Sequence, residues 1–527
     1  MRSRLIIIAV VIAAAVGMLL GGLAQPGILM LSDMLLPEAS ATPTELSDSY
    51  VYPYLYELRL RNPGCPIFAT DRPYVRMELA EWLAECMDAD SLKDARSLWL
   101  HGMLEEDLAG ETGLLGASRT GWTLDTVLGS RAASDAKATA DGFARFSVYS
   151  PWGLSLWSSI RVTLNDPYGH KTYARVWKDR GRASIEHGGI GYRRKWFSIF
   201  FGRDEIAWGA DRKRGLLFSG SAPSYDMLKL SFGTGRFRYT SFHTRLRQIE
   251  DNEARPTGDQ ETWEAAYMRR YVSAHRLDIK AGRMLTFSVT EAVIYGGYMR
   301  NFEPVYLNPA GLLYAEQWNS HTDDNILIAG DFSFLVPGRV EIRGELMVDD
   351  FQYDFGNEPH KFAAGLGIAG VNPLRPARSM LGGSYYHVRG GTYNHHIVWN
   401  RFVHEGHIMG YPGGPDGDRL ALWTSMALPD PVHWRMEYSY MRQGEGSVTD
   451  VQLPESPRAG FPSGIVETEH RLGLGLTWRP AFAWMLSGSV VYSSRDNLDN
   501  TEGQSESGFD FGLGLTFNYK TAGWFGD

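Results

Sequence analysis

Residues 326–350 carry the pattern that most limits how this chain can fold. After the Pro337-Gly338 pair, alternate positions are apolar, namely Val340, Ile342, Leu346 and Val348. The positions between them are charged, namely Arg339, Glu341, Arg343, Glu345 and Asp349. A period of two indicates a β-strand with one apolar and one charged face, and Pro-Gly favours a tight reversal before it. The strand of about eleven residues is long enough to cross a bilayer at a tilt, but a soluble β-sandwich alternates in the same way.

The composition excludes several classes of protein. Charged residues make up 21% of the 527 residues. The net charge of -9 argues against a nucleic-acid-binding protein, because such a protein needs a basic surface. Aromatic residues make up 13% and there are 58 glycines. Because the hydrophobic content is ordinary, a disordered chain is also excluded.

The N-terminus has the pattern of a secretory signal peptide, which we place at residues 1–41. Arg2 and Arg4 precede an apolar run over 5–20, and both 22–24 and 39–41 fit the small-x-small rule for cleavage, so the cleavage site stays open. The alternative is an uncleaved N-terminal anchor. After residue 45 no apolar run is long enough for a membrane helix, so we expect an exported protein that crosses any membrane by strands.

The chain has two cysteines, Cys65 and Cys86. In an oxidising compartment an isolated pair predicts one disulfide, which would contribute about 3 kcal/mol by closing a short loop. The alternative is two buried thiols.

Residues 46–112 have the periodicity of helices and are expected to form a small helical region in the periplasm. Val51, Tyr54, Leu55 and Leu58 share one face of the first predicted helix. Residues 113–140, rich in Gly, Ala, Ser and Thr, are expected to be a linker.

From residue 141 to 520 the pattern is that of strands. Phe509, Phe511, Leu513, Leu515, Phe517 and Tyr519 alternate with small or polar residues. Tight turns, such as Ala281-Gly282 and Pro480-Ala481, alternate with long connections. This rhythm is typical of an outer-membrane barrel, so we predict an all-β fold: an antiparallel transmembrane β-barrel of about 18 strands. Between 361 and 403 there are three strand-like runs, although the long loops on either side require an even number of strands between them, namely two. Gly390-Gly391 is therefore a candidate β-bulge within one long strand.

Several segments resemble the capsule assembly Wzi family of Gram-negative outer-membrane proteins. These segments are 201–209, 221–229, 275–278, 291–297, 306–309, 324–325, 345–352 and 414–419, together with the helical pattern over 50–83. The resemblance implies an outer-membrane barrel, in contact with membrane lipids, that binds and anchors capsular or exopolysaccharide as a non-enzymatic lectin. One departure is the C-terminus, where eight residues follow Tyr519 although such barrels often end on an aromatic residue.

A saccharide site needs aromatic faces for sugar C–H surfaces and polar groups for hydroxyls. Loops of the predicted barrel supply both. The candidate polysaccharide-binding residues are Asp204, Trp208, Trp318, Asp324, Asp349, Asp350, Tyr353, Tyr411 and Asp416. For any one aromatic, a place in the interfacial girdle is the competing explanation. The charges on alternate positions of the 339–349 strand, with Arg435 and Glu437, are expected to face the lumen, where structural ion pairing is the simpler explanation.

Other functions were weighed against this one. Glu291, Glu316, Asp349 and Asp350 are candidates for a glycosidase pair, although carboxylate pairs arise by chance among 61 acidic residues. We expect no catalytic residue and no cofactor. We also expect no metal, because the spacing of His404 and His407 is not that of a zinc protease, and Asp323-Asp324 and Asp416-Gly-Asp418 give only a weak signal for calcium. The runner-up function is a porin-like channel for small solutes or oligosaccharides.

Overall fold

The computed structural model describes most of the chain after residue 43. The described residues are 44–45, 49–63, 67–86, 92, 94–133, 136–165, 176, 181–211, 213–251, 266–320, 322–337, 339–349, 361–372, 378–450 and 460–525. The predicted signal peptide, Cys65, Asp350 and Tyr353 lie outside these ranges, so the disulfide stays a prediction. Within them, no helix is long and apolar enough to cross a membrane.

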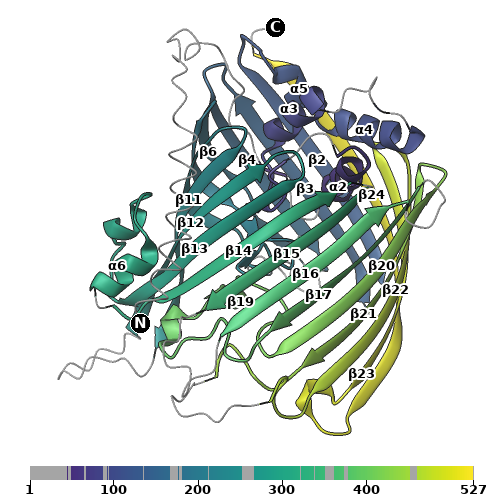
Figure 1. The fold of residues 1–527 in the computed structure, drawn as a ribbon. Coiled ribbons are helices and arrows are strands. Elements are labelled where there is room, and N and C mark those ends of the chain that lie inside the picture. The colour runs from purple at the N-terminus through teal and green to yellow at the C-terminus, as the bar shows by residue number, and fades with distance from the viewer. Residues whose placement is uncertain are drawn as a thin grey trace.

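The described strands close into an antiparallel barrel with eighteen strand positions, as predicted (Figure 1). The first strands are β2 (Gly121–Ala133), β3 (Ala136–Tyr149), β4 (Leu154–Leu164), β5 (Gly181–Ser184), β6 (Gly188–Arg194), β7 (Phe197–Asp204), β10 (Tyr225–Gly233), β11 (Phe237–Asp251) and β12 (Ala266–Ala281). The others are β13 (Leu285–Tyr298), β14 (Asn325–Val336), β15 (Val340–Asp349), β16 (Phe362–Val371), β17 (Ser379–Val388), β20 (Gly417–Leu428), β21 (Val432–Gln443), β22 (Glu467–Ala481), β23 (Trp484–Asp496) and β24 (Ser505–Trp524). The short strands β5 and β6 both pair with β4 and share one position, and β2 pairs with β24 to close the ring.

Two expectations about the strands need correction, one over residues 113–140 and one over residues 361–403. The predicted linker over 113–140 is wrong, because β2 and β3 occupy residues 121–149 with alternating burial. Its small residues are strand residues with little side chain to pack. Between 361 and 403 the structure has two barrel strands, β16 and β17, as parity requires. The Gly390-Gly391 pair is a turn that leads out of β17, with Gly391 at φ 78°, and is not a bulge.

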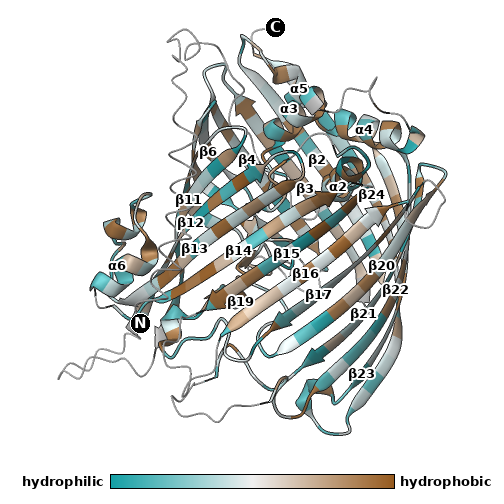
Figure 2. Ribbon diagram, viewed as in Figure 1, coloured by the Kyte–Doolittle hydropathy of each residue, from teal (hydrophilic) through white to brown (hydrophobic). Residues whose placement is uncertain are grey.

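The opening hairpin forms as predicted from its alternating pattern. Asp331 lies opposite Glu345 and Ser333 opposite Arg343 across β14 and β15. Along β15, Glu341, Glu345 and Asp349 are buried inside the barrel, whereas Leu346 is 53% exposed on the outer wall. Apolar and polar residues alternate in this way along the strands (Figure 2), which gives the barrel a lipid-facing exterior.

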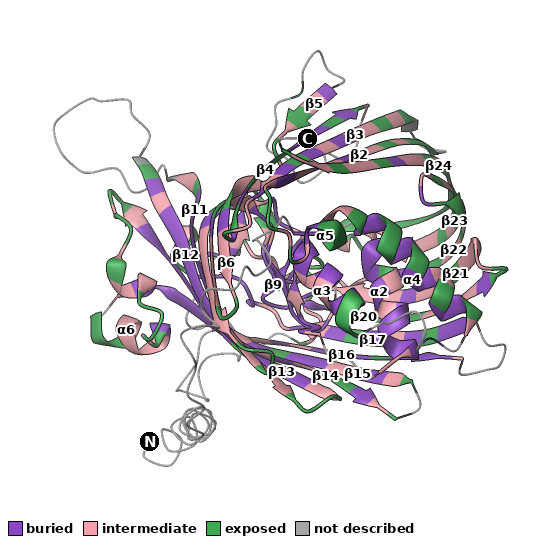
Figure 3. Ribbon diagram, turned by 90° about the horizontal axis from the view of Figure 1, so that it is seen from above, coloured by how far each residue is buried: buried purple, intermediate pink, exposed green. Residues whose placement is uncertain are grey.

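Four helices lie at the end of the barrel where the short turns are, inside the ring of strands when viewed along the barrel (Figure 3). They are α2 (Val51–Arg61), α3 (Arg76–Cys86), α4 (Ala95–Asp107) and α5 (Ala109–Leu114). Their apolar faces pack together around Leu58, Ala80 and Leu100. Arg96 of α4 donates to the carbonyl oxygen of Asp430, in the turn between β20 and β21, at 3.2 Å.

Two long loops from the opposite end of the barrel fold into the lumen. The loop over 205–224 contains β8 (Ala207–Trp208) and β9 (Phe218–Ser219), and the loop over 389–416 contains β18 (Val403–His404) and β19 (His407–Ile408). The backbone N–H of Ser219 donates to Met409 at 2.9 Å, which joins the two loops. With the N-terminal residues and helices they form a plug, whose apolar core includes side chains of both loops and of the barrel wall.

Buried polar bonds attach the plug to the wall. Arg276 of β12 is 1% exposed and donates to Asp331 at 2.8 Å and to Thr70 of the N-terminal segment at 2.8 Å. Glu345 of β15 accepts the backbone N–H groups of Ala210 and Leu216 in the 205–224 loop. Of the charges that were predicted to face the lumen, Arg339 lies exposed in the turn before β15. The others are inside the barrel, and those on β15 hold the plug in place.

Asp107, the last residue of α4, belongs to a similar group of buried, oppositely charged side chains. It pairs with Arg76 of α3 at 2.9 Å and with Lys520 of β24. Although burial opposes ionisation, Lys520 and Arg76 hold the pKa of Asp107 well below its ordinary value. The helices are thus tied to the last strand of the barrel by charge.

Candidate functional site

The plug does not cover the barrel wall evenly. On β12, the inward-facing residues between positions 268 and 278 are all buried, namely Met268, Arg270, Val272, Ala274, Arg276 and Asp278. On β23, the inward-facing residues are all partly exposed, namely Met485, Ser487, Ser489, Val491, Ser493 and Arg495. We call the partly exposed inward side of β20–β24 the exposed luminal face. It is the part of the interior that solvent, or a ligand, can reach.

The wall of the exposed luminal face is built from small residues. Gly473, Gly475, Ser487, Ser489, Gly512 and Gly514 occupy inward positions of β22, β23 and β24. In the sequence, Gly512 and Gly514 were noted only because they alternate with apolar residues. Because they carry little side chain, they leave room between the wall and the plug.

Charged and aromatic groups meet on this face where β20 and β21 approach the plug. Glu437 lies 2.9 Å from the guanidinium of Arg435 and 3.4 Å from that of Arg214, which belongs to the plug loop 205–224. A third arginine, Arg419, lies 3.8 Å from Glu437. Arg435 also stacks over the ring of Trp423, with its guanidinium carbon 4.4 Å from the ring centroid.

This group, which we call the luminal arginine cluster, comprises Arg214, Arg419, Trp423, Arg435 and Glu437. Its charged side chains are 24–44% exposed, so they are neither sealed in the core nor free on the surface. Three guanidinium groups share Glu437, and Arg214 also lies 3.9 Å from Asp211. A guanidinium has five N–H donors, so the cluster keeps donors for hydroxyl or carboxylate oxygens of a ligand.

Sequence reasoning found part of this cluster. Arg435 and Glu437 were placed in the lumen by their alternation, but Trp423, Arg419 and Arg214 were not singled out. Trp423 and Arg419 stand at alternate positions of β20, so the alternation of the sequence could have placed both in the lumen. No sequence pattern could have placed Arg214 there, because only the folding of its loop into the lumen brings it to Glu437.

Three of the predicted polysaccharide-binding residues belong to the plug or its attachment to the wall. Trp208 is 2% exposed, contacts Phe218 edge to face at 5.5 Å and donates to Asp71. The carboxylate of Asp204 is hydrogen-bonded to the hydroxyl of Thr44 and to Nδ1 of His187. Tyr411 is buried and stacks on Tyr386 at 5.3 Å. These three side chains are thus packed within the protein, and their role as direct ligand contacts stays a prediction.

Three predicted carboxylates are also buried and bonded within the protein. Asp324 accepts from Arg300 and from Tyr306, and Asp349 accepts the backbone N–H of Tyr393. Asp416 accepts the backbone N–H groups of Gly446 and Ser463. These carboxylates fix external loops, because each satisfies donors that the loops would otherwise leave unpaired. The role of these three carboxylates as direct ligand contacts likewise stays a prediction.

Trp318 is in a different place from the other candidates. It lies on α6 (Leu313–Ser320), which stands outside the ring of strands beside β13 (Figure 3), and its side chain is 65% exposed. Asp350 and Tyr353 lie outside the described residues and stay predictions. The structure therefore does not bring the nine predicted residues together.

Two of the carboxylates weighed as a glycosidase pair, Glu291 and Asp349, are separated. Glu291 is on the outer side of β13, where it accepts the backbone N–H groups of Leu313 and Tyr314 at the start of α6. Asp349 is on the inner side of β15. The barrel wall stands between these two groups.

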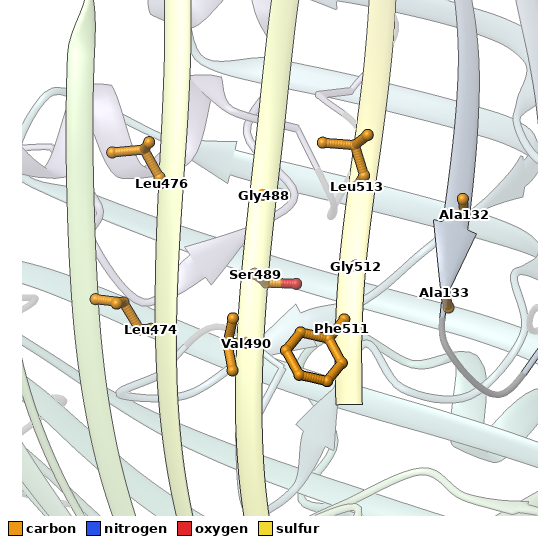
Figure 4. Close-up of a pocket in the computed structure, with 10 residues that line it drawn as sticks. All are labelled: Ala132, Ala133, Leu474, Leu476, Gly488, Ser489, Val490, Phe511, Gly512 and Leu513. Atoms are coloured by element: carbon orange, nitrogen blue, oxygen red, sulfur yellow. The ribbon is translucent and has the colours of Figure 1, made fainter. Parts of the chain in front are cut away.

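One groove of about 480 Å³ lies on the barrel wall at β2 and β22–β24 (Figure 4). Its lining is mostly apolar and includes Leu474, Leu476, Val490, Phe511 and Leu513. These residues occupy the outward positions of their strands, and Gly488 leaves space between them. The groove thus belongs to the lipid-facing surface and not to the luminal site.

The family of the chain follows from comparison with known proteins. The family model described as capsule assembly protein Wzi matches residues 118–507, which is most of the barrel. The chain belongs to the Wzi family. This confirms the family suggested by the sequence, and the protein is an outer-membrane barrel of a Gram-negative bacterium.

Solved structures are similar to this Wzi family member, and the first one named below supports its fold. One is described as Wzi, an outer-membrane protein involved in group 1 capsule assembly in Escherichia coli and a carbohydrate-binding β-barrel. It is 12% identical, covers 91% of this chain and 99% of its own, and has a TM-score of 0.61. OprD from Pseudomonas aeruginosa is 9% identical, covers 76% and 95%, and has a TM-score of 0.45. No curated protein matches the sequence.

Proposed function

We propose that this Wzi family member binds capsular or exopolysaccharide and anchors it at the cell surface without catalysing a reaction. The proposal is supported by family membership and by a solved relative that is described as carbohydrate-binding. We place the binding site on the exposed luminal face, with the luminal arginine cluster at its centre. The N-terminal helices are then at the periplasmic end, and the long loops are outside the cell.

The observation that carries this placement is the group of arginine side chains that share Glu437 beside Trp423. Guanidinium groups donate to hydroxyl and carboxylate oxygens, and an indole face packs on sugar C–H groups. Each contact competes with water and is weak alone. A polymer of repeating units that engages many copies of the barrel is nevertheless held firmly, because the contacts add through multivalency.

Retention of polysaccharide on cells tests the proposed function. Deleting the gene from a strain that makes capsule should move polysaccharide from the cell-attached fraction to the medium, and the wild-type gene should restore attachment. Polysaccharide in the two fractions is measured after gentle centrifugation. Retention that is unchanged by the deletion would contradict anchoring, whatever site is involved.

The alternative function, a porin-like channel, makes a different prediction. The plug packs against β4–β17 through a buried apolar core. Below the exposed luminal face, the N-terminal helices contact the wall through Arg96 to Asp430 and through Asp107 to Lys520. Because these two contacts close both sides of the lumen, we expect the purified protein to give no steady ohmic conductance in a planar bilayer. An open porin that is reconstituted in the same way serves as the positive control. Steady conductance proportional to voltage would contradict the anchoring proposal in its simple form and favour the channel.

A further inference from the structure

Two external loops bring three metal-ligating side chains together outside the luminal site. Asp323 precedes β14 in the loop over 299–324, and His395 and His396 belong to the plug loop over 389–416. The ligand atoms of the three residues all lie within 4.8 Å of one another. The sequence predicted no metal because its histidines were compared only with each other, whereas the loop folding adds the carboxylate.

The distances between these atoms fit a single small cation. One oxygen of Asp323 lies 2.7 Å from Nε2 of His396, and its other oxygen lies 3.8 Å from Nε2 of His395. In a tetrahedral site with metal–ligand distances near 2.1 Å, ligand atoms stand about 3.4 Å apart. The two observed distances bracket this value, so small side-chain rotations would bring all three atoms to one ion.

The backbone around the three side chains is held by hydrogen bonds. Asn400 donates through its side chain to the carbonyl oxygen of Asp323 at 2.7 Å, and Asn325 donates to the carbonyl oxygen of Asn400 at 3.0 Å. His395 is 6% exposed, while His396 and Asp323 are open to solvent. One ligand is therefore fixed in the protein and two are accessible, which provides an entry path for an ion.

The hydrogen bonds of His395 show which ring nitrogen faces Asp323. The imidazole ring stacks on that of His396, with 4.4 Å between the ring centroids. Its Nδ1 accepts the backbone N–H of Ile397 at 3.1 Å, which places the ring proton on Nε2 toward Asp323. An ion at Nε2 would displace that proton to Nδ1, at the expense of the contact with Ile397.

We propose that Asp323, His395 and His396 form a binding site for a divalent transition-metal ion of the Zn²⁺ type. Two imidazole nitrogens and one carboxylate are the donor set that Zn²⁺ accepts with a fourth position left to water. The bound ion joins the loop before β14 to the plug loop. It thereby stabilises the external end of the plug and is independent of the luminal arginine cluster.

Titration of the full-length protein in detergent with Zn²⁺ tests this site. The protein carries no polyhistidine tag and is first treated with EDTA, and heat of binding is measured by calorimetry. We expect one equivalent of Zn²⁺ per chain. Because loss of a partner that merely orients a ligand costs 10- to 100-fold in affinity, removal of a ligand in His396→Ala should cost at least about tenfold.

The matched control is His407→Ala, since His407 is an exposed histidine of the same loop that is outside the cluster. It should bind Zn²⁺ like the wild type. Both histidines are exposed, so neither change should unfold the barrel, and equal far-ultraviolet circular dichroism verifies this. The proposal is rejected if the wild type binds no ion or if His396→Ala binds as tightly as His407→Ala.

Cobalt provides a second readout that does not depend on affinity alone. Co²⁺ bound at a four-coordinate site with two imidazoles gives visible d–d absorption, which should appear in the wild type and disappear in Asp323→Asn. A plain histidine–aspartate hydrogen bond would give no absorption in either protein. That result would overturn the metal site even if Zn²⁺ bound weakly elsewhere.

Discussion

Replacing Arg419 and Arg435 together by glutamine is expected to lower the affinity of the purified protein for its polysaccharide by about a hundredfold. The two guanidinium groups flank Glu437 on the exposed luminal face. A hydrogen bond to a charged group contributes about 1.5–3 kcal/mol, and 1.4 kcal/mol corresponds to a factor of ten, so two arginines account for about this loss. Glu437 keeps its contact with Arg214, so no isolated charge is left behind.

Surface plasmon resonance with immobilised polysaccharide from the producing strain measures this effect. The control is Arg203→Gln with Arg269→Gln, which makes the same chemical change on outward positions of β7 and β12. We expect the control to bind like the wild type, and binding of the wild type to weaken as salt is added. Equal losses in the two double variants, or no loss in the luminal one, would move the site away from the arginine cluster.

The second large effect is expected from Arg276→Met, which removes the buried cation between the plug and the wall. Arg276 contacts Asp278 at 2.9 Å and Asp331 at 2.8 Å. Methionine would leave both carboxylates buried without their partner. Breaking a buried pair in this way costs about 3 to 5 kcal/mol, because the remaining charge is desolvated and uncompensated.

Unfolding by urea, followed by tryptophan fluorescence in detergent, measures the stability of the variant. The matched control is Arg435→Met, since that arginine is 44% exposed and its pair with Glu437 is screened by water. Such pairs contribute at most about 1 kcal/mol. A variant of Arg276 as stable as the control would contradict the role of this arginine in attaching the plug.

The sequence predicts the barrel well because membrane strands are governed by a local rule. Alternation with a period of two identifies the wall, and short turns alternating with long loops give its orientation, as in the hairpin over 326–349. The failure at 113–140 has a local cause as well. Small residues there suggested a linker, although small residues are common in the strands of this barrel, as at Gly512 and Gly514.

The site could be predicted only in part, because loop folding is not a local property. Trp208 and Asp349 stand in or beside external connections and have the chemistry of a saccharide site. Nothing in the sequence shows that the loops turn inward. There Trp208 packs against Phe242, and Asp349 accepts a hydrogen bond from the backbone N–H of Tyr393. Arg214 is the converse case, since the same inward fold brings an unremarked loop residue to Glu437. The plug thus decides which candidate residues remain accessible.

Cross-linking from neighbouring positions on β23 tests most directly whether polysaccharide occupies the luminal side. A photoreactive amino acid at position 489 replaces Ser489 on the inward face, and one at position 490 replaces Val490 on the outward face. In capsulated cells, we predict that illumination attaches polysaccharide to the protein labelled at 489 and not to the protein labelled at 490. Attachment only at 490, or equal attachment at both positions, would contradict a luminal site.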